Sequence, residues 1–110
     1  MRRGDLYRVA HPFRTDPKRF RVFVVVSRQV LCDTAEYSTV ICAPVSSSRQ
    51  GLATQVPVGG AEGLKHASAV HCDGLVSLPE TALTDYMGSL GPQKLAALHV
   101  ALKVALDLLN

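Results

Sequence analysis

Phe20-Arg21-Val22-Phe23-Val24-Val25-Val26-Ser27 is the stretch of sequence that decides the fold. All residues from Val22 to Val26 are β-branched or aromatic, which favours a β-strand and leaves it no polar face. A strand that is apolar on both sides is buried on both sides, so we expect it inside a barrel or sandwich and not at an edge. Arg21 stands at the mouth of this strand. Its guanidinium cannot enter the core unpaired, so it is either solvated at the rim or directed at an anion.

Further strands are predicted on both sides of this stretch. Residues 6–9 alternate after a Gly-Asp turn, which indicates a short strand. Residues 39–45 are nearly all apolar, so we expect this second strand to pair beside the first buried one. Residues 54–58 alternate but contain Pro57, which indicates an edge strand. Residues 68–72 and 75–78 complete the set of predicted strands.

Two helices are predicted near the end of the chain. Pro79 suits the first position of a short helix that ends at Gly88, and Gly91-Pro92 begins a longer one. From Gln93 onward the apolar residues have helical spacing, at positions 95, 98, 102, 105, 106 and 109. The chain is therefore predicted to be an α+β protein, a small antiparallel β-barrel followed by a C-terminal amphipathic helix.

Length and composition limit the classes of protein that remain. The 110 residues are enough for a single domain, residues 1–110, with one core. No apolar run approaches the ~20 residues that a membrane span requires, and no apolar segment follows the basic start as in a signal peptide. Three cysteines without paired spacing indicate reduced thiols in a cytoplasmic protein, with Cys42 and Cys72 buried as small hydrophobes.

Charge is distributed unevenly along the chain. Residues 1–28 contain eight Lys/Arg and two Asp/Glu, whereas the remaining residues contain four Lys/Arg and seven Asp/Glu. A basic N-terminal quarter on an acidic body is expected of a surface that faces phosphates. A merely solvated face explains the charge count equally well.

Three strand ends carry side chains suited to phosphodiester cleavage. Arg21 opens the buried strand, Ser46 closes the next strand, and Asp73 follows a third strand after His71. In RNA cleavage without a metal, a base takes the 2′-hydroxyl proton, donors hold the charge at phosphorus, and an acid protonates the leaving 5′-oxygen. Strand alternation would place His71 and Asp73 on one face.

Each of these residues also has a structural explanation. Asp73-Gly74 is a strong hairpin-turn signal, Ser46 can simply end a strand, and single histidines in strands are more often structural than catalytic. The four histidines form no metal-binding pattern with Cys or Asp, and residues 59–63 lack the lysine and hydroxyl of a phosphate loop. We therefore expect no metal and no cofactor.

Five segments occur in an order that resembles the MazF/PemK family of toxin–antitoxin ribonucleases. They are the opening Gly4-Asp5-Leu6-Tyr7, residues 21–27, residues 41–46, residues 68–73, and a Gly88-x-Leu90 step before the closing helix. The resemblance covers essentially the whole chain. It implies a homodimeric SH3-like barrel that cleaves single-stranded RNA without metal, leaving a 2′,3′-cyclic phosphate and a 5′-hydroxyl, and a cognate antitoxin that blocks the site.

The resemblance also implies roles for individual residues. Arg21 matches the catalytic arginine of the family, Ser46 its phosphate-contacting threonine, and Asp73 the aspartate that acts as base in the PemK-like branch. His71 stands where that branch can carry a catalytic arginine. Three departures fall at the site itself: Val22 replaces the proline after the arginine, Ser46 the threonine, and Gly74 a polar residue after the aspartate.

Basic loop residues are expected to contact the RNA backbone. They are His11, Arg14, Lys18, Arg19 and Arg49. The candidate loops, residues 10–20 and 47–53, contain one aromatic residue ahead of the strand, Phe13, so no base preference can be read from them.

Two alternatives remain open at this point. The related CcdB-type toxin shares the barrel and poisons a topoisomerase by binding alone, through a C-terminal tryptophan that this chain lacks. A catalytically inactive family member that still pairs with an antitoxin is the other, because the departures lie at the site.

Overall fold

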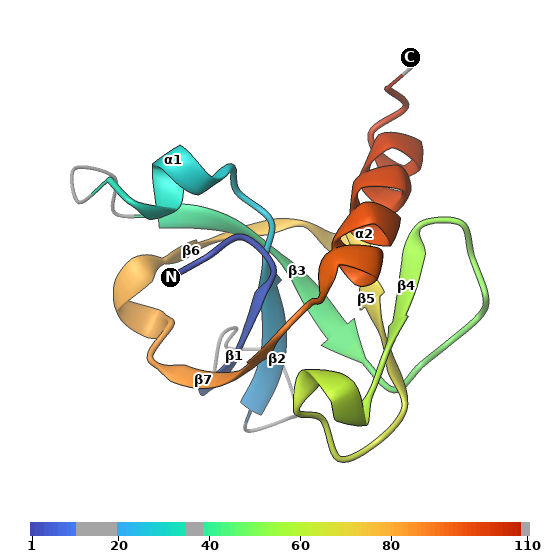
Figure 1. Ribbon diagram of the computed structural model, residues 1–110, viewed down its shortest axis with the longest axis horizontal. Helices are drawn as coiled ribbons and strands as arrows, with labels where there is room; N and C mark the ends of the chain where they lie inside the picture. The colour runs from blue at the N-terminus through green and yellow to red at the C-terminus, as the bar shows by residue number, and fades with distance from the viewer. Residues whose placement is uncertain (11–19, 35–38, 109–110) are drawn as a thin grey trace.

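The buried stretch forms a strand in the middle of one curled sheet. β2 (Phe20–Val25) lies between β1 (Asp5–Ala10) and β3 (Thr39–Ser46), so the predicted interior position is confirmed (Figure 1). The computed structural model describes residues 1–10, 20–34 and 39–108 of the chain. Within them, Phe23 to Val26 are all buried. A run of residues with no polar side thus lies where both faces of the sheet are covered.

The remaining strands extend the sheet on both sides of β2. The order is β4-β5-β3-β2-β1-β7, with β6 also paired to β3, and every pairing is antiparallel. These strands are β4 (Gln55–Val58), β5 (Ser68–His71), β6 (Val76–Pro79) and β7 (Asp85–Ser89). β3 curls the sheet, because its first half pairs with β6 and its second half with β5. The predicted α+β fold class is confirmed, and β4 is at an edge as Pro57 indicated.

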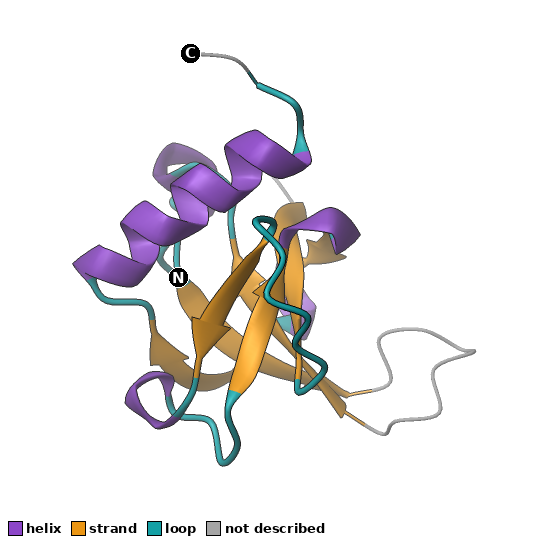
Figure 2. Ribbon diagram, turned by 90° about the vertical axis from the view of Figure 1, so that its right-hand side faces the viewer, coloured by secondary structure: helices purple, strands orange, loops and turns teal. Residues whose placement is uncertain are grey.

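Each face of the sheet packs into its own cluster of buried side chains. Leu6 and Val24 belong to the first cluster, whereas Tyr7, Phe23 and Val25 belong to the second. The alternation along β1 and β2 therefore distributes side chains between two cores. α2 (Pro92–Ala105) lies across the strands and covers the first cluster (Figure 2).

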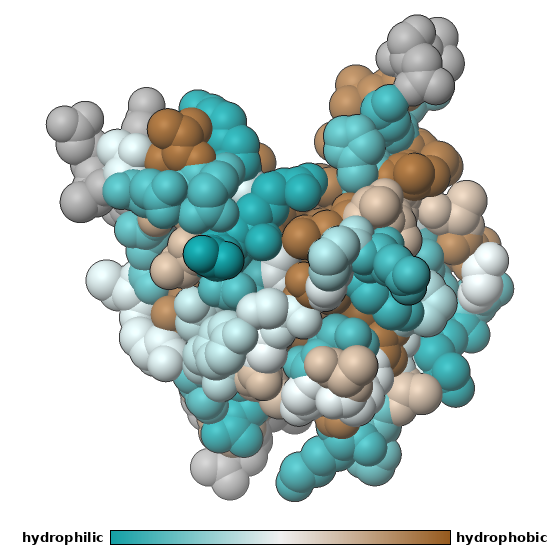
Figure 3. Space-filling view, viewed as in Figure 1, coloured by the Kyte–Doolittle hydropathy of each residue, from teal (hydrophilic) through white to brown (hydrophobic). Residues whose placement is uncertain are grey.

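α2 confirms the predicted C-terminal helix but only part of its predicted apolar face. Leu98 and Ala101 are buried against the sheet. Leu106, which the spacing placed on the same face, is exposed because the helix ends at Ala105, and Leu109 lies outside the described residues. Val100 and Val104 also face outward, and brown apolar surface is visible over the helix in Figure 3.

The predicted helix from Pro79 to Gly88 is wrong. That segment contains a short 3₁₀ turn, η3 (Glu80–Ala82), followed by β7, which pairs with β1. Without β7, the long first strand would leave its outer backbone groups unpaired. The polar connection after β2 contains a short helix, α1 (Gln29–Cys32), that the sequence did not reveal.

Two glycines permit a close backbone contact between β7 and the turn η1 (Gly60–Glu62). A Cβ on Gly88 would collide with the carbonyl oxygen of Glu62, and a Cβ on Gly63 with the carbonyl oxygen of Met87. Gly63 also has a φ of 88°, which side-chain-bearing residues rarely adopt. Buried Glu62 completes the turn by accepting a 2.7 Å hydrogen bond from the Gly59 N–H.

No helix in residues 1–10, 20–34 and 39–108 is long and apolar enough to cross a membrane. The same residues contain no group of three or more His, Cys, Asp or Glu side chains placed to hold a metal ion.

Candidate active site

Arg21 and Ser46 lie side by side at the open end of β2 and β3. The last registered pair between these strands is Val22 with Val45, and Arg21 and Ser46 are the next residue outward on each strand. Both line one groove of about 320 Å³ at this end of the sheet. The structure thus brings together the cation and the hydroxyl that sequence placed 25 positions apart.

The hydroxyl of Ser46 is oriented by the backbone that follows it. Its oxygen accepts a 3.1 Å hydrogen bond from the Ser48 N–H, which leaves its own proton to donate elsewhere. Ser46 is half-buried, as is Arg21. A positive guanidinium and a hydroxyl donor at one groove suit a phosphate oxygen.

The groove has an apolar floor and a polar rim. Val22, Val45, Leu64 and Met87 supply the floor. The basic and aromatic lining residues include four that were not site candidates from the sequence: Arg8 on β1, Phe20 at the start of β2, and Lys65 and His66 in the loop before β5. Knowledge of the strand register would have indicated Lys65 and His66, because their loop leads into β5, where Ala69 pairs with Ser46.

His71 is held by the loop that connects β3 to β4. Its Nε2 donates a 2.9 Å hydrogen bond to the carbonyl oxygen of Ser48, and its Nδ1 lies 3.4 Å from the amide nitrogen of Gln55. His71 pairs with Gln55 across β4 and β5. The imidazole therefore stands next to the Ser46 end of β3 and also anchors the loop.

Asp73 does not continue the strand, so the prediction that alternation places it on one strand face with His71 is wrong. β5 ends at His71, and residues 72–74 form a 3₁₀ turn, η2 (Cys72–Gly74). The Asp73 carboxylate accepts a 2.6 Å hydrogen bond from the Thr54 hydroxyl. Gly74 packs against Pro44, and a Cβ there would lie 3.1 Å from the proline ring, so a larger residue after Asp73 would require the ring to shift by a few tenths of an ångström.

Arg49 lines a second pocket, of about 210 Å³, on the neighbouring strands. Ala69 in that pocket pairs with Ser46 on one side and with Pro57 on the other. The second pocket therefore lies on the strands next to Ser46, although it shares no lining residue with the groove. The other predicted backbone-binding residues, His11, Arg14, Lys18 and Arg19, lie outside the described residues.

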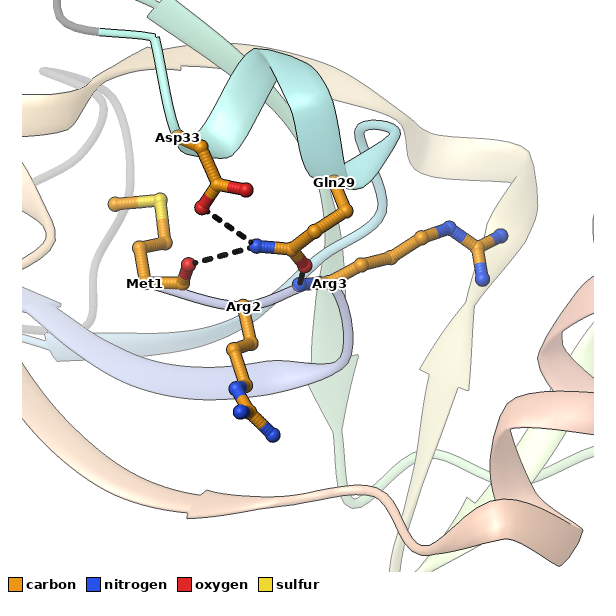
Figure 4. A pocket seen from close by; sticks show the side chains of 5 residues that line it. All are labelled: Met1, Arg2, Arg3, Gln29 and Asp33. Carbon is orange, nitrogen blue, oxygen red and sulfur yellow. Dashed lines mark hydrogen bonds between the residues drawn. The ribbon is translucent and has the colours of Figure 1, made fainter.

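The basic N-terminal segment does not form one continuous surface among the described residues. Arg8 and Arg21 lie at the groove end of β1 and β2. Arg2 and Arg3 line a cavity of about 590 Å³ at the opposite end, next to α1 (Figure 4). There Gln29 accepts a 2.8 Å hydrogen bond from the Arg3 N–H and donates one of 2.9 Å to Asp33. Among the described residues, the basic N-terminal segment therefore contributes Arg8 and Arg21 to the groove, and Arg2 and Arg3 to the opposite end of the sheet.

The thiols of the two buried cysteines are unreactive, as their apolar surroundings in the sequence predicted. Cys42 and Cys72 are 0% and 1% exposed. Burial raises the pKa of the Cys42 thiol to about 12 and that of the Cys72 thiol to about 11. Because the thiolate is the nucleophile, neither residue is suited to catalysis near neutral pH.

Comparisons with known proteins agree with the fold and with the family resemblance seen in the sequence. A sequence model described as PemK-like, MazF-like toxin of type II toxin-antitoxin system matches residues 2–106. Endoribonuclease MazF3 of Mycobacterium tuberculosis H37Rv is 33% identical over 88 residues, 80% of this chain and 84% of that protein.

Solved structures give the same result. The Mycobacterium tuberculosis toxin MazF-mt6 has a TM-score of 0.82 at 27% identity, covering 96% of this chain and 99% of that one. An endoribonuclease in complex with its cognate antitoxin, from a mycobacterial species, has a TM-score of 0.84 over 100% of this chain and 98% of that one; at 23% identity it supports the fold alone.

The chain belongs to the PemK-like, MazF-like toxin family of type II toxin–antitoxin systems. Within that family it is similar to proteins named as MazF endoribonucleases and MazF toxins.

Proposed function

We propose that this protein is an endoribonuclease toxin that cleaves single-stranded RNA without a metal ion. The observation that carries the proposal is the shared groove of Arg21 and Ser46, a cation and an oriented hydroxyl at the mouth of two paired strands. Family membership and the MazF3 relative support the same activity.

The proposed reaction is an attack within the RNA. The ribose 2′-oxygen bonds to the adjacent phosphorus while the bond from phosphorus to the 5′-oxygen breaks, giving a 2′,3′-cyclic phosphate and a 5′-hydroxyl. Arg21 and Ser46 bind the non-bridging oxygens, where negative charge grows in the transition state. Donors already fixed in place stabilise that charge without reorganising.

Two proton transfers complete the reaction. Asp73 takes the 2′-hydroxyl proton, and His71 in its protonated form donates to the leaving 5′-oxygen. Both groups are attached to the loop that begins immediately after Ser46, through Thr54 and through Ser48. His66, which lines the groove itself, is the competing candidate for the acid.

The proposal includes partners and a place of action. A cognate antitoxin is expected to block the groove, and the protein is expected to act in the cytoplasm as a homodimer with a self-complementary interface. Sedimentation should then give twice the chain mass of 11.8 kDa, and a monomer at micromolar concentration contradicts the dimer.

One experiment tests the activity. Purified protein is incubated with single-stranded RNA in EDTA, and fragments with 5′-hydroxyl and cyclic phosphate ends are expected. Arg21→Ala is the matched control for a contaminating nuclease. Intact RNA would instead favour the two alternatives, a CcdB-type binding toxin or an inactive family member.

A further inference from the structure

Phe20 is an exposed aromatic side chain on the rim of the groove. Its relative exposure is 42%, although it begins β2, whose last three residues, Phe23 to Val25, are buried. It lines the groove together with Arg21, its neighbour in sequence. An exposed phenylalanine alone is ordinary, so the side chains around it decide whether it has a role.

Arg8 lies over the ring of Phe20. The guanidinium carbon of Arg8 is 4.7 Å from the ring centroid. Arg8 pairs with Val22 on β2, and Phe20 is two residues further out on the same face, so the contact follows from the register. The ring and the guanidinium are therefore two flat groups at one wall of the groove.

Asp85 on β7 fixes the direction of Arg8. The Arg8 Nε donates a 2.8 Å hydrogen bond to the Asp85 carboxylate, and Asp85 pairs with Arg8 in the sheet. Both side chains are about half exposed, so the ion pair contributes little to stability. Its effect is to hold the guanidinium in one orientation.

The groove next to this pair has the shape and chemistry for one nucleobase. Its volume of about 320 Å³ is at the lower end for ligand sites, and Val22, Val45 and Leu64 give it an apolar lining. Lys65 and Arg21 supply positive charge for the phosphates on either side of such a base. Unpaired bases are characteristically bound by stacking on aromatic rings and on guanidinium planes.

We propose that Arg8 and Phe20 form a stacking platform that holds one unpaired base of the RNA beside Arg21 and Ser46. Asp85 is the positioning residue that keeps the Arg8 guanidinium in place. The inference rests on the proposed function only in taking single-stranded RNA as the ligand. It adds a base contact, whereas the proposed reaction uses only contacts to the phosphate and the ribose.

The test measures binding separately from cleavage. A fluorescent 2′-O-methyl RNA oligonucleotide of mixed sequence lacks the attacking hydroxyl, so its affinity is measured without turnover across several salt concentrations. Phe20→Leu keeps an apolar side chain but removes the flat ring. It should weaken binding by about 5- to 100-fold with an unchanged salt slope, because no phosphate contact is lost.

Three further variants sharpen the result. Phe20→Trp should retain the affinity, because it keeps a ring to stack on. Tyr86→Leu removes an exposed aromatic residue that does not line the groove, and should leave the affinity unchanged. Asp85→Asn should weaken binding in the wild-type background and have no further effect in Phe20→Leu, since the two residues serve one platform.

Two results overturn the platform. If Phe20→Leu binds the oligonucleotide like the wild type, the ring does not stack on a base, and wild-type cleavage of ordinary RNA in EDTA would leave the proposed function standing. If Phe20→Leu loses affinity together with salt slope, the lost contact is to phosphate. If wild type fails to cleave RNA but Phe20→Leu binds more weakly at unchanged slope, the platform is supported and the nuclease is not.

Discussion

The Thr54 hydroxyl donates a 2.6 Å hydrogen bond to the Asp73 carboxylate, and this bond joins the β3–β4 loop to the turn after β5. The carboxylate is therefore both a loop tie and the proposed base. Asp73→Asn separates the two roles, since the amide oxygen still accepts from Thr54 but cannot take a proton at neutral pH. We expect Asp73→Asn to slow cleavage by about 10²- to 10⁴-fold.

Thr54→Val is the matched control for this variant. It removes the tie and keeps the carboxylate, so a small loss of activity is expected. Initial rates on one RNA under single-turnover conditions provide the comparison. Equal losses in the two variants would mean that Asp73 acts only as a tie.

Arg21→Ala should be the most damaging substitution at the groove. Removing one donor to the transition-state charge costs about a hundredfold or more in rate. Arg21→Lys should recover part of that loss, because it restores the charge but not the planar fork. Thermal melting should change little, because the side chain lies at the rim. Cleavage by Arg21→Ala at the wild-type rate would contradict the proposed role of Arg21 in binding the phosphate.

His71→Gln tests the proposed acid while preserving its structural contact. The glutamine amide can still donate to the Ser48 carbonyl oxygen, so the loop stays anchored. A bell-shaped dependence of the cleavage rate on pH is expected for the wild type. His71→Gln should remove its alkaline limb, and His66→Gln should not. If His66→Gln removes the alkaline limb and His71→Gln does not, the general acid is His66 in the groove.

Lys18 and Arg19 are predicted to contact phosphates just ahead of β2. Replacing both with Ala should lower the salt slope of RNA binding by about 1.4, at ~0.7 per phosphate contact on a single strand. The cleavage sequence should stay the same. Arg2→Ala with Arg3→Ala is the control, because those residues lie next to α1, at the end of β2 opposite the groove. An altered cleavage sequence would mean that Lys18 or Arg19 reads bases.

Alkaline pH should destabilise the fold through its buried thiols. In the unfolded chain both thiols ionise near pH 8.5, whereas in the folded state Cys42 and Cys72 hold their protons until about 12 and 11. The unfolded state therefore binds fewer protons above pH 9, and the free energy of unfolding must fall as the pH rises. Urea titrations at pH 8, 9 and 10 measure the decline. Cys42→Ala with Cys72→Ala should flatten it, and an equally steep decline would assign it to other groups.

The sequence predicted the sheet better than it predicted the site. The apolar run of β2 and the edge proline of β4 are strong local signals, because burial and a missing N–H act on single residues. β7 was mistaken for a helix because its reason for being a strand is not local: it covers the outer edge of β1. The sequence could place Arg21 and Ser46 near each other because one stands at the start of a predicted strand and the other at the end of the next.

The rest of the groove depends on contacts that no local pattern contains. Lys65 and His66 come from a loop whose position is set by pairing further along the chain. Phe20 looks like the first residue of a buried strand, and only the register shows that it is at the exposed end. The alternation that placed His71 and Asp73 on one face failed because the strand stops at His71 and a turn begins.

The contact between Gly63 and Gly88 gives one wall of the groove an unusual origin. Lys65 and His66 follow a turn that rests on β7 through bare backbone, with no side chain as a spacer. The position of this wall therefore depends on the absence of a Cβ at Gly63 and Gly88, neither of which lines the groove. A methyl group at residue 88 would collide with the Glu62 carbonyl oxygen, so β7 or the turn would have to shift. We expect the groove wall to shift with them, although no residue that lines the groove would have changed. Substrate choice in this protein can therefore change through residues that never meet the substrate.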